Sequence, residues 1–259
     1  MTAKQLSICN AAALIVTIFI NYLSNTGIVN NNTMKDVSDR YQNHFTPAGY
    51  AFSIWGLIYL ALLAFVIYGL AGTFKKKSTD TGFVTQIDWW FVISCMANCF
   101  WIFAWLYDYT GLSVLIMIIL LVALFRIVIV TNVKRERSTF KKSLFVWLPF
   151  SLYSGWITVA LIANIAAYLI KIKWNGFGIT EVNWAIIMIC AAVIINLFMT
   201  WSRRMWEYAL VGVWALAAIA INNQSSSKPV VQTAFIASGI LLVSCILHAL
   251  KPQKVVHDK

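Results

Sequence analysis

Aromatic and amide side chains recur at helical spacing in three apolar segments of the chain. Trp55 and Tyr59 are four residues apart, and residues three or four apart lie on one face of an α-helix. Two further segments show the same spacing, with Asn98, Trp101 and Trp105 in one and Pro149, Tyr153, Trp156, Ala160 and Asn164 in the other. Such faces can bind a flat apolar molecule by ring stacking, with a few polar groups to orient it.

The same side chains have an alternative role in packing. Trp and Tyr often form belts at a membrane surface, and an Asn inside a membrane often bonds to a neighbouring helix. Trp55, Trp101 and Trp156 lie further inside their segments, which favours a lined pocket. Since lipid offers no hydrogen-bonding partner, we expect Asn98 and Asn164 to face the interior of a bundle. A belt suits the remaining tryptophans near segment ends better: Trp89, Trp90, Trp174, Trp184, Trp201 and Trp206.

The chain shows no arrangement typical of catalysis or metal binding. It has no nucleophile-elbow, zinc-protease or phosphate-binding glycine motif and no closely spaced carboxylate pair. Asp108 in "WLYDYTG" is interpreted as a turn residue, and His44 as a loop residue at the mouth of the first aromatic segment. All cysteines lie in apolar segments, where we expect them to pack: Cys9, Cys95, Cys99, Cys190 and Cys245. We therefore expect no enzymatic activity, no metal and no resident cofactor.

The elements that carry these faces must be membrane helices. Hydrophobic residues make up 61% of the chain, charged residues 11%, and the mean hydropathy is +0.77. A soluble domain of 259 residues cannot bury so much apolar surface, so the lipid bilayer is the expected partner. The net charge of +11 does not indicate nucleic-acid binding, because the basic residues lie between long apolar runs and form no continuous stripe.

Eight apolar runs are long enough to cross a hydrocarbon core, which takes about 20 helical residues. The sequence therefore predicts an all-α polytopic membrane bundle of eight transmembrane helices, with runs at Leu6–Leu23, Gly49–Ala71, Trp89–Tyr107, Leu112–Val133, Leu144–Ile170, Val182–Trp201, Met205–Ile221 and Val230–Leu250. The first run is interpreted as a mature helix, because no signal-peptide cleavage motif follows it.

Basic residues predict the orientation of this bundle. With eight spans, fourteen Lys and Arg lie in the tails and loops on the side of the termini, and five lie in the opposite loops. Cytoplasmic loops carry the excess of basic residues, so both termini are expected in the cytoplasm. Arg126, inside the fourth run, is expected to extend toward the cytoplasmic lysines. Residue usage and the absence of a targeting peptide favour a bacterial inner membrane.

Three stretches of the sequence together resemble the tryptophan-rich sensory protein family, which includes the mitochondrial translocator protein. These stretches are "FTPAGYAFSIWGLIY", "NCFWIFAWLYD" and "PFSLYSGWITVALIAN". The resemblance covers roughly Leu6 to Ile170 and implies a five-helix core. It leaves three C-terminal helices unexplained. We therefore expect a five-helix unit over residues 1–171, followed by three further helices and a short cytoplasmic tail over residues 172–259.

The resemblance also implies functional residues. Pro47, Trp55 and Tyr59 match the family's motif at the second helix, whereas Thr46, Gly49 and Ser53 stand where the family usually has Pro, Trp and Pro. Asn98 and Trp101 match a pair on the third helix. With the faces described above, the candidate ligand-binding residues are Pro47, Ser53, Trp55, Tyr59, Asn98, Trp101, Trp105, Pro149, Tyr153, Trp156 and Asn164.

The function implied is that of a membrane receptor or sensor. Its ligand would be a tetrapyrrole, a sterol or a similar flat apolar molecule, held in a pocket that is closed by the loop from Asn30 to Thr46. A transporter of a small solute is the alternative, and an enzyme that modifies a bound porphyrin is a third. The residues leave open which ligand binds and whether the chain forms a homodimer.

Overall fold

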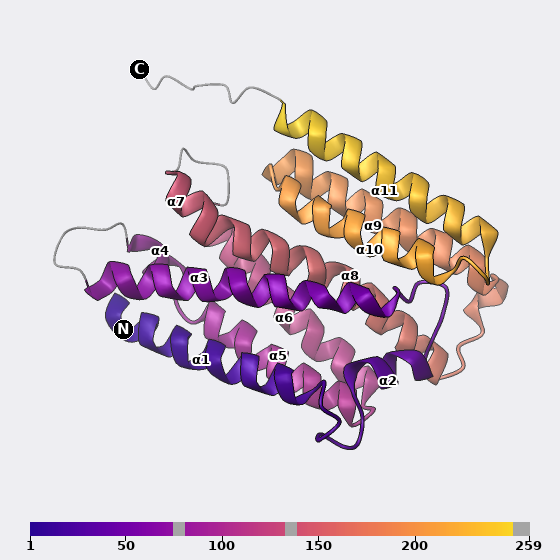
Figure 1. Ribbon diagram of the computed structural model, residues 1–259, viewed down its shortest axis with the longest axis horizontal. Coiled ribbons are helices and arrows are strands. Elements are labelled where there is room, and N and C mark those ends of the chain that lie inside the picture. The colour runs from indigo at the N-terminus through magenta and orange to yellow at the C-terminus, as the bar shows by residue number, and fades with distance from the viewer. Residues whose placement is uncertain (75–80, 133–138, 251–259) are drawn as a thin grey trace.

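The computed structural model describes residues 1–74, 81–132 and 139–250, and in these ranges every element of secondary structure is helical (Figure 1). The all-helical prediction is confirmed for this part of the chain. Its long helices are α1 (Ala3–Leu23), α3 (Ile54–Phe74), α5 (Trp90–Leu106), α6 (Thr110–Val130), α8 (Leu148–Lys171), α9 (Glu181–Arg203), α10 (Trp206–Asn222) and α11 (Lys228–Ala249). Each of the eight predicted runs corresponds to one of these helices, within a few residues at its ends.

The lengths of these helices divide them into two groups. Six helical stretches, which contain α1, α3, α6, α8, α9 and α11, are long and apolar enough to cross a membrane. The other two, α5 and α10, are apolar but have 17 residues each. A hydrocarbon core takes about 20 helical residues. The protein is thus a helical bundle of the membrane type, and six of the eight predicted spans meet the length requirement.

The first five long helices form a closed ring. Neighbours in contact around this ring are α1 and α3, α3 and α8, α8 and α6, α6 and α5, and α5 and α1. The last three helices, α9, α10 and α11, each contact the other two and form a second group, which lies beside the ring in Figure 1. The two groups meet mainly where α10 packs on α8. α8 therefore packs against helices of both groups.

The packing of α8 explains this central position. The window that identifies it as a span is 72% buried, against 28–39% for the other five spans. A Cβ atom on Gly155 would lie 2.9 Å from the backbone oxygen of Tyr208, so glycine lets α8 and α10 approach closely. At the same contact the Tyr208 hydroxyl donates a hydrogen bond to Thr158 Oγ1 at 2.5 Å. Small and hydroxyl-bearing residues commonly join membrane helices in this way.

Short elements complete the described chain: α2 (Met34–Arg40), the 3₁₀ turns η1 (Gly49–Ser53) and η3 (Gly176–Gly178), α4 (Gly82–Ile87), α7 (Phe140–Lys142) and the π-helical turn η2 (Ser143–Trp147). Pro149 is the second residue of α8, after Leu148, which follows η2 directly. Proline has no N–H to continue the α-helical hydrogen bonds, and π-helical turns accompany such interruptions.

The segment between α1 and η1, residues 24–48, lies across one end of the ring and is called the cover below. Its helix α2 begins at a reciprocal capping box, in which Thr33 Oγ1 accepts from Asp36 N at 3.2 Å and Asp36 Oδ2 accepts from Thr33 N at 2.8 Å. Phe45 in the same segment is fully buried. The predicted loop therefore contains a short helix and is packed against the protein.

Candidate functional site

Trp55 is the centre of a cluster of aromatic rings inside the five-helix ring. Its indole stacks on Tyr59 at a centroid distance of 5.4 Å and lies 6.2 Å from Trp101. It meets the rings of Tyr153 at 5.8 Å and Trp156 at 6.4 Å edge to face. Both geometries are favourable for aromatic pairs. Three helices, α3, α5 and α8, thus bring the three predicted faces together.

Trp55 stands at the start of α3, rather than well inside the helix as predicted. The preceding residues Gly49–Ser53 form the 3₁₀ turn η1, so the α-helix begins only at Ile54. Phe52 from this turn packs edge to face on Trp156 at 6.2 Å. The aromatic cluster consequently lies close to the cover.

Polar side chains join the same helices. Asn98 on α5 is fully buried and donates a hydrogen bond from Nδ2 to the Tyr153 hydroxyl at 2.9 Å. Asn164 on α8 accepts a hydrogen bond from Ser113 on α6 at 2.9 Å. Both amides face the bundle interior, as predicted. Trp105 reaches the cover, where its Nε1 donates to the Met34 carbonyl at 3.3 Å.

A cavity of about 50 Å³ lies between the aromatic cluster and the cover. Ligand pockets typically enclose roughly 300 to 1,000 Å³. The cavity is therefore too small for a tetrapyrrole or a sterol while the cover stays in place. Its lining residues come from the cover, η1, α3, α5 and α8: Met34, Ser38, Tyr41, Thr46, Pro47, Phe52, Trp55, Trp101, Trp105, Trp156, Val159, Ala160, Ala163, Asn164 and Ala167.

Two of the residues that line this cavity carry buried donors without an acceptor. The Nε1 atoms of Trp101 and Trp156 make no hydrogen bond with any residue in the described ranges. The two indoles are 5% and 2% exposed. An unsatisfied buried donor lowers stability by about 1 to 3 kcal/mol, and a bound molecule that supplied an acceptor would remove this penalty.

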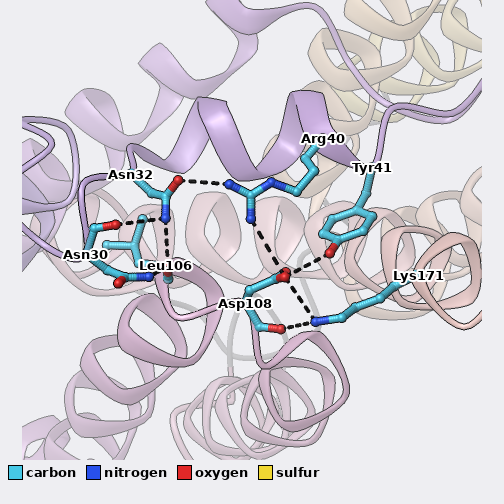
Figure 2. Close-up of polar contacts among 7 residues, drawn as sticks. All are labelled: Asn30, Asn32, Arg40, Tyr41, Leu106, Asp108 and Lys171. Atoms are coloured by element: carbon cyan, nitrogen blue, oxygen red, sulfur yellow. Dashed lines mark hydrogen bonds and ion pairs between the residues drawn. The ribbon is translucent and has the colours of Figure 1, made fainter.

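The cover is held down at one end by a cluster of charges around Asp108 (Figure 2). The Tyr41 hydroxyl donates to Asp108 Oδ2 at 2.9 Å, and Arg40 Nη1 lies 3.7 Å from the same oxygen. Lys171, at the end of α8, forms an ion pair with that oxygen at 3.1 Å and also donates to the Asp108 carbonyl. Burial, and then the hydrogen bond to Asp108, raise the pKa of Tyr41. We call these four residues the latch.

Asp108 occupies the turn between α5 and α6 with φ +65°, a left-handed conformation that Asp and Asn tolerate best among residues with side chains. Beside it, Asn30 Nδ2 donates to the Leu106 carbonyl at 2.8 Å, and Arg40 Nη2 donates to Asn32 Oδ1 at 2.9 Å (Figure 2). The turn residue predicted from "WLYDYTG" therefore also fastens the cover, which sequence spacing alone does not indicate.

The other end of the cover is held by α10. Asn222 Nδ2 donates to the Thr46 carbonyl, and Asn223 Nδ2 donates to the His44 carbonyl, both at 3.0 Å. His44 Nδ1 lies 2.7 Å from Asn223 Oδ1. Since that oxygen can only accept, this imidazole nitrogen is the donor. Further along, Ala48 N donates to the Ala218 carbonyl at 3.1 Å. We call Asn222 and Asn223 the clasp.

The predicted ligand-binding residues fall into three groups in the structure. Six line the cavity: Pro47, Trp55, Trp101, Trp105, Trp156 and Asn164. Three more adjoin this set through ring contacts or the Asn98 hydrogen bond: Tyr59, Asn98 and Tyr153. The remaining two do not line it: Ser53 and Pro149.

Both exceptions have a physical reason. Ser53 is exposed, because in the turn η1 the neighbouring Phe52 and the following Trp55 take the inward positions. Pro149 is buried but stands at the start of α8, whereas the residues of α8 that line the cavity begin at Trp156. About two turns of helix separate them, and each turn rises about 5.4 Å.

The clasp residues are not among those predicted from the sequence. Asn222 and Asn223 end an apolar run as "AINN", and two adjacent amides at that place are a polar signal that a helix interior would not carry. Nothing in the sequence says which backbone they bind. Trp174 and Trp184, interpreted as belt residues, pack on each other at 5.0 Å and are only partly exposed.

A family model described as "TSPO-like protein" matches residues 7–247 of the chain. This match confirms the family indicated by the three motifs and extends it beyond Ile170 through the last three helices. No curated protein and no solved structure matches the chain.

Proposed function

Because the chain belongs to the TSPO-like protein family, we propose that it is a membrane receptor or sensor that binds a flat apolar ligand under the cover. A tetrapyrrole or a sterol has the chemistry that the site offers. The rings of Trp55, Trp101 and Trp156 provide stacking surfaces, and Asn164 provides an amide at the edge of the cavity. Rings of this kind contribute about 0.5 to 1.5 kcal/mol per contact beyond their buried area.

The unpartnered Nε1 atoms of Trp101 and Trp156 are the single observation that carries this proposal. A lipid tail could fill the cavity but could not accept their hydrogen bonds. A flat molecule with nitrogen or oxygen acceptors at its rim satisfies both donors and stacks on the same rings. The proposed ligand is therefore apolar on its faces and polar at one edge.

Binding of such a ligand requires the cover to move. The present cavity of about 50 Å³ is several times smaller than pockets that hold molecules of this size. The latch and the clasp hold the two ends of the cover, so one of them must yield, and both are polar and lie outside the aromatic cluster. We propose that the latch end opens, because the ion pair that joins the cover to the ring there is partly exposed: the Arg40 side chain is 44% exposed and that of Asp108 29%.

We further propose that all eight long helices span the membrane, with both termini cytoplasmic and the cover on the opposite side. This orientation is supported by the fourteen basic residues against five. Of the loops that carry the majority, residues 75–80, 133–138 and 251–259 lie outside the described ranges. A cytoplasmic reporter fused after Lys259 should be active, and activity of a periplasmic reporter there would contradict the orientation.

We propose that residues 1–171 form the ligand-binding unit and that residues 172–259 support it. The support acts through α10, which carries the clasp and packs on α8. This division assigns a task to the three helices that the sequence motifs left unexplained.

The test is a titration of the purified protein in nanodiscs with protoporphyrin IX, followed by the porphyrin absorption band and by quenching of tryptophan fluorescence. Trp101→Leu should weaken binding by about tenfold, since one lost stack and one lost hydrogen bond together approach 1.4 kcal/mol. Trp89→Leu is the matched control, because Trp89 is 43% exposed and remote from the cavity lining. Equal affinity of Trp101→Leu and the parent would refute the site.

The same protein in liposomes separates a receptor from a transporter. A receptor retains a porphyrin loaded inside the liposomes at the rate of protein-free liposomes. Release that depends on the protein would favour the transporter.

A further inference from the structure

A second and larger cavity lies outside the five-helix ring, at its junction with the last three helices. It has a volume of about 300 Å³, at the lower end of the range for small-molecule pockets. The end of α8, the loop 172–180, the start of α9 and residues 43–45 of the cover surround it. Six of its lining residues carry the argument: His44, Phe45, Trp174, Glu181, Trp184 and Met188. We call it the junction cavity.

Two indole rings form one part of its wall. Trp174 and Trp184 are 5.0 Å apart at an angle of 55°, and both are partly buried. The Trp184 ring is held by a hydrogen bond from Nε1 to the Gly176 carbonyl at 2.8 Å. Phe177 packs edge to face on Trp174 at 5.1 Å. The two indoles thus form one aromatic surface, in which a hydrogen bond holds the Trp184 ring. Such surfaces attract cations most strongly when they are tryptophans.

The charged side chain that lines the cavity is acidic. Glu181 lies in the first turn of α9, and no Lys or Arg is among the lining residues. Within the described ranges the Glu181 carboxylate forms no ion pair with the protein. His44 donates through Nδ1 to Asn223, so in its neutral form the other ring nitrogen is an acceptor. The cavity therefore offers negative charge and acceptors to a bound group.

The floor of the cavity is apolar. Phe45 is fully buried there, and Leu169 and Met188 add aliphatic surface. We propose that the junction cavity binds an organic ammonium ion with an apolar body, whose charged head lies between Glu181 and the two indoles. The ammonium group can belong to a soluble amine or to the headgroup of a membrane lipid. This site is separate from the aromatic cavity and does not depend on what that cavity binds.

The test uses the full chain in nanodiscs of phosphatidylglycerol, which has no ammonium group. Benzyltrimethylammonium is titrated by isothermal calorimetry, beside its neutral isostere neopentylbenzene. The ammonium ion should bind saturably and the neutral compound at least about fivefold more weakly, because only the former gains from Glu181 and the indoles.

Three variants locate the site. Glu181→Gln removes one charge from an exposed side chain with no change of shape, and it should weaken binding of the ammonium ion by roughly threefold to fivefold. Trp174→Leu should weaken it by roughly fivefold, and Trp174→Phe should restore part of the loss. Asp39→Asn is the control, because that exposed carboxylate on α2 pairs with Lys35 outside the cavity.

The outcomes decide the proposal. Equal binding of the ion and its isostere, no saturable binding in phosphatidylglycerol, or equal affinity of the Glu181→Gln, Trp174→Leu and parent proteins would each overturn it. Repeating the titration in phosphatidylcholine distinguishes the sources. Both titrations are made at high salt, which screens the negative charge of the phosphatidylglycerol surface. A loss of affinity in phosphatidylcholine then identifies the lipid headgroup as the competing occupant, whereas unchanged affinity identifies a soluble amine.

Discussion

Replacing Asp108 by Asn should increase the affinity for a ligand of the aromatic cavity. The parent protein must break the latch before a large ligand can enter, because the closed cavity measures only about 50 Å³. The observed dissociation constant is the intrinsic constant divided by the fraction of molecules that are open. Any change that weakens the closed state without touching the cavity therefore strengthens binding.

The size of the effect follows from the contacts of Asp108. Its carboxylate meets Lys171 at 3.1 Å and Arg40 at 3.7 Å, and its side chain is 29% exposed. Lys171 lies on α8, so the contacts that join the cover to this carboxylate are those of Arg40 and Tyr41. A partly exposed ion pair contributes about 0.2 to 1 kcal/mol, and the Tyr41 hydrogen bond weakens when its acceptor loses its charge, so the substitution weakens the closed state by about 1 kcal/mol. This corresponds to an increase in affinity of about fivefold. Asn keeps the left-handed backbone of this position, so the variant tests charge and not strain.

The assay compares porphyrin affinity of the parent, Asp108→Asn and Asp39→Asn in nanodiscs at low and high salt. The advantage of Asp108→Asn should shrink at high salt, because salt already screens the latch in the parent. Asp39→Asn lies in the cover but outside the latch and should bind as the parent does. Affinity that is unchanged or lower in a folded Asp108→Asn protein would refute the inference that the latch closes the site.

Three further outcomes are expected. Burial and Asp108 raise the pKa of Tyr41 above its usual value of 10, so at lower pH the neutral hydroxyl stabilises the closed cover. This stabilisation is lost as the pH rises through the raised pKa. Porphyrin affinity should therefore increase in that pH range in the parent protein, but not in Tyr41→Phe. Asn223→Ala leaves the His44 carbonyl without its amide donor and should speed hydrogen exchange in the cover by about tenfold. Gly155→Ala should lower thermal stability by about 1 to 3 kcal/mol through its contact with the Tyr208 backbone, whereas Gly239→Ala on α11, with open space around it, should not.

Much of the fold could be predicted from the sequence because its signals are local. Long apolar runs specify helices, and each predicted run is a helix in the structure. The spacing of three and four residues also predicted which faces of α3, α5 and α8 are lined with aromatic rings, and Trp55, Trp101 and Trp156 of these faces line one cavity. Ser53 is an exception, because it was predicted as a ligand-binding residue from its place in the motif, but it ends a 3₁₀ turn and is exposed.

Contacts between distant segments could not be predicted in this way. The latch joins Asp108 to Tyr41 and Lys171 across 67 and 63 residues of sequence, and the clasp joins Asn223 to His44 across 179. Each uses ordinary polar residues at helix ends, which occur at many other places in the chain. The small volume of the cavity was equally hidden, since it depends on how closely the cover packs.

Because α8 packs against both groups of helices, the protein cannot be divided cleanly between them. The boundary near residue 171 separates two groups of helices in sequence, yet α8 presents one face to each group and the clasp crosses the same boundary. Removal of α9, α10 and α11 would strip the wall behind Gly155 and leave the carbonyls of His44 and Thr46 without donors. The first five helices thus carry all the sequence motifs, but their packing is completed by the last three. Any fragment that ended at residue 171 would need a substitute surface at this position, from lipid or from a second polypeptide.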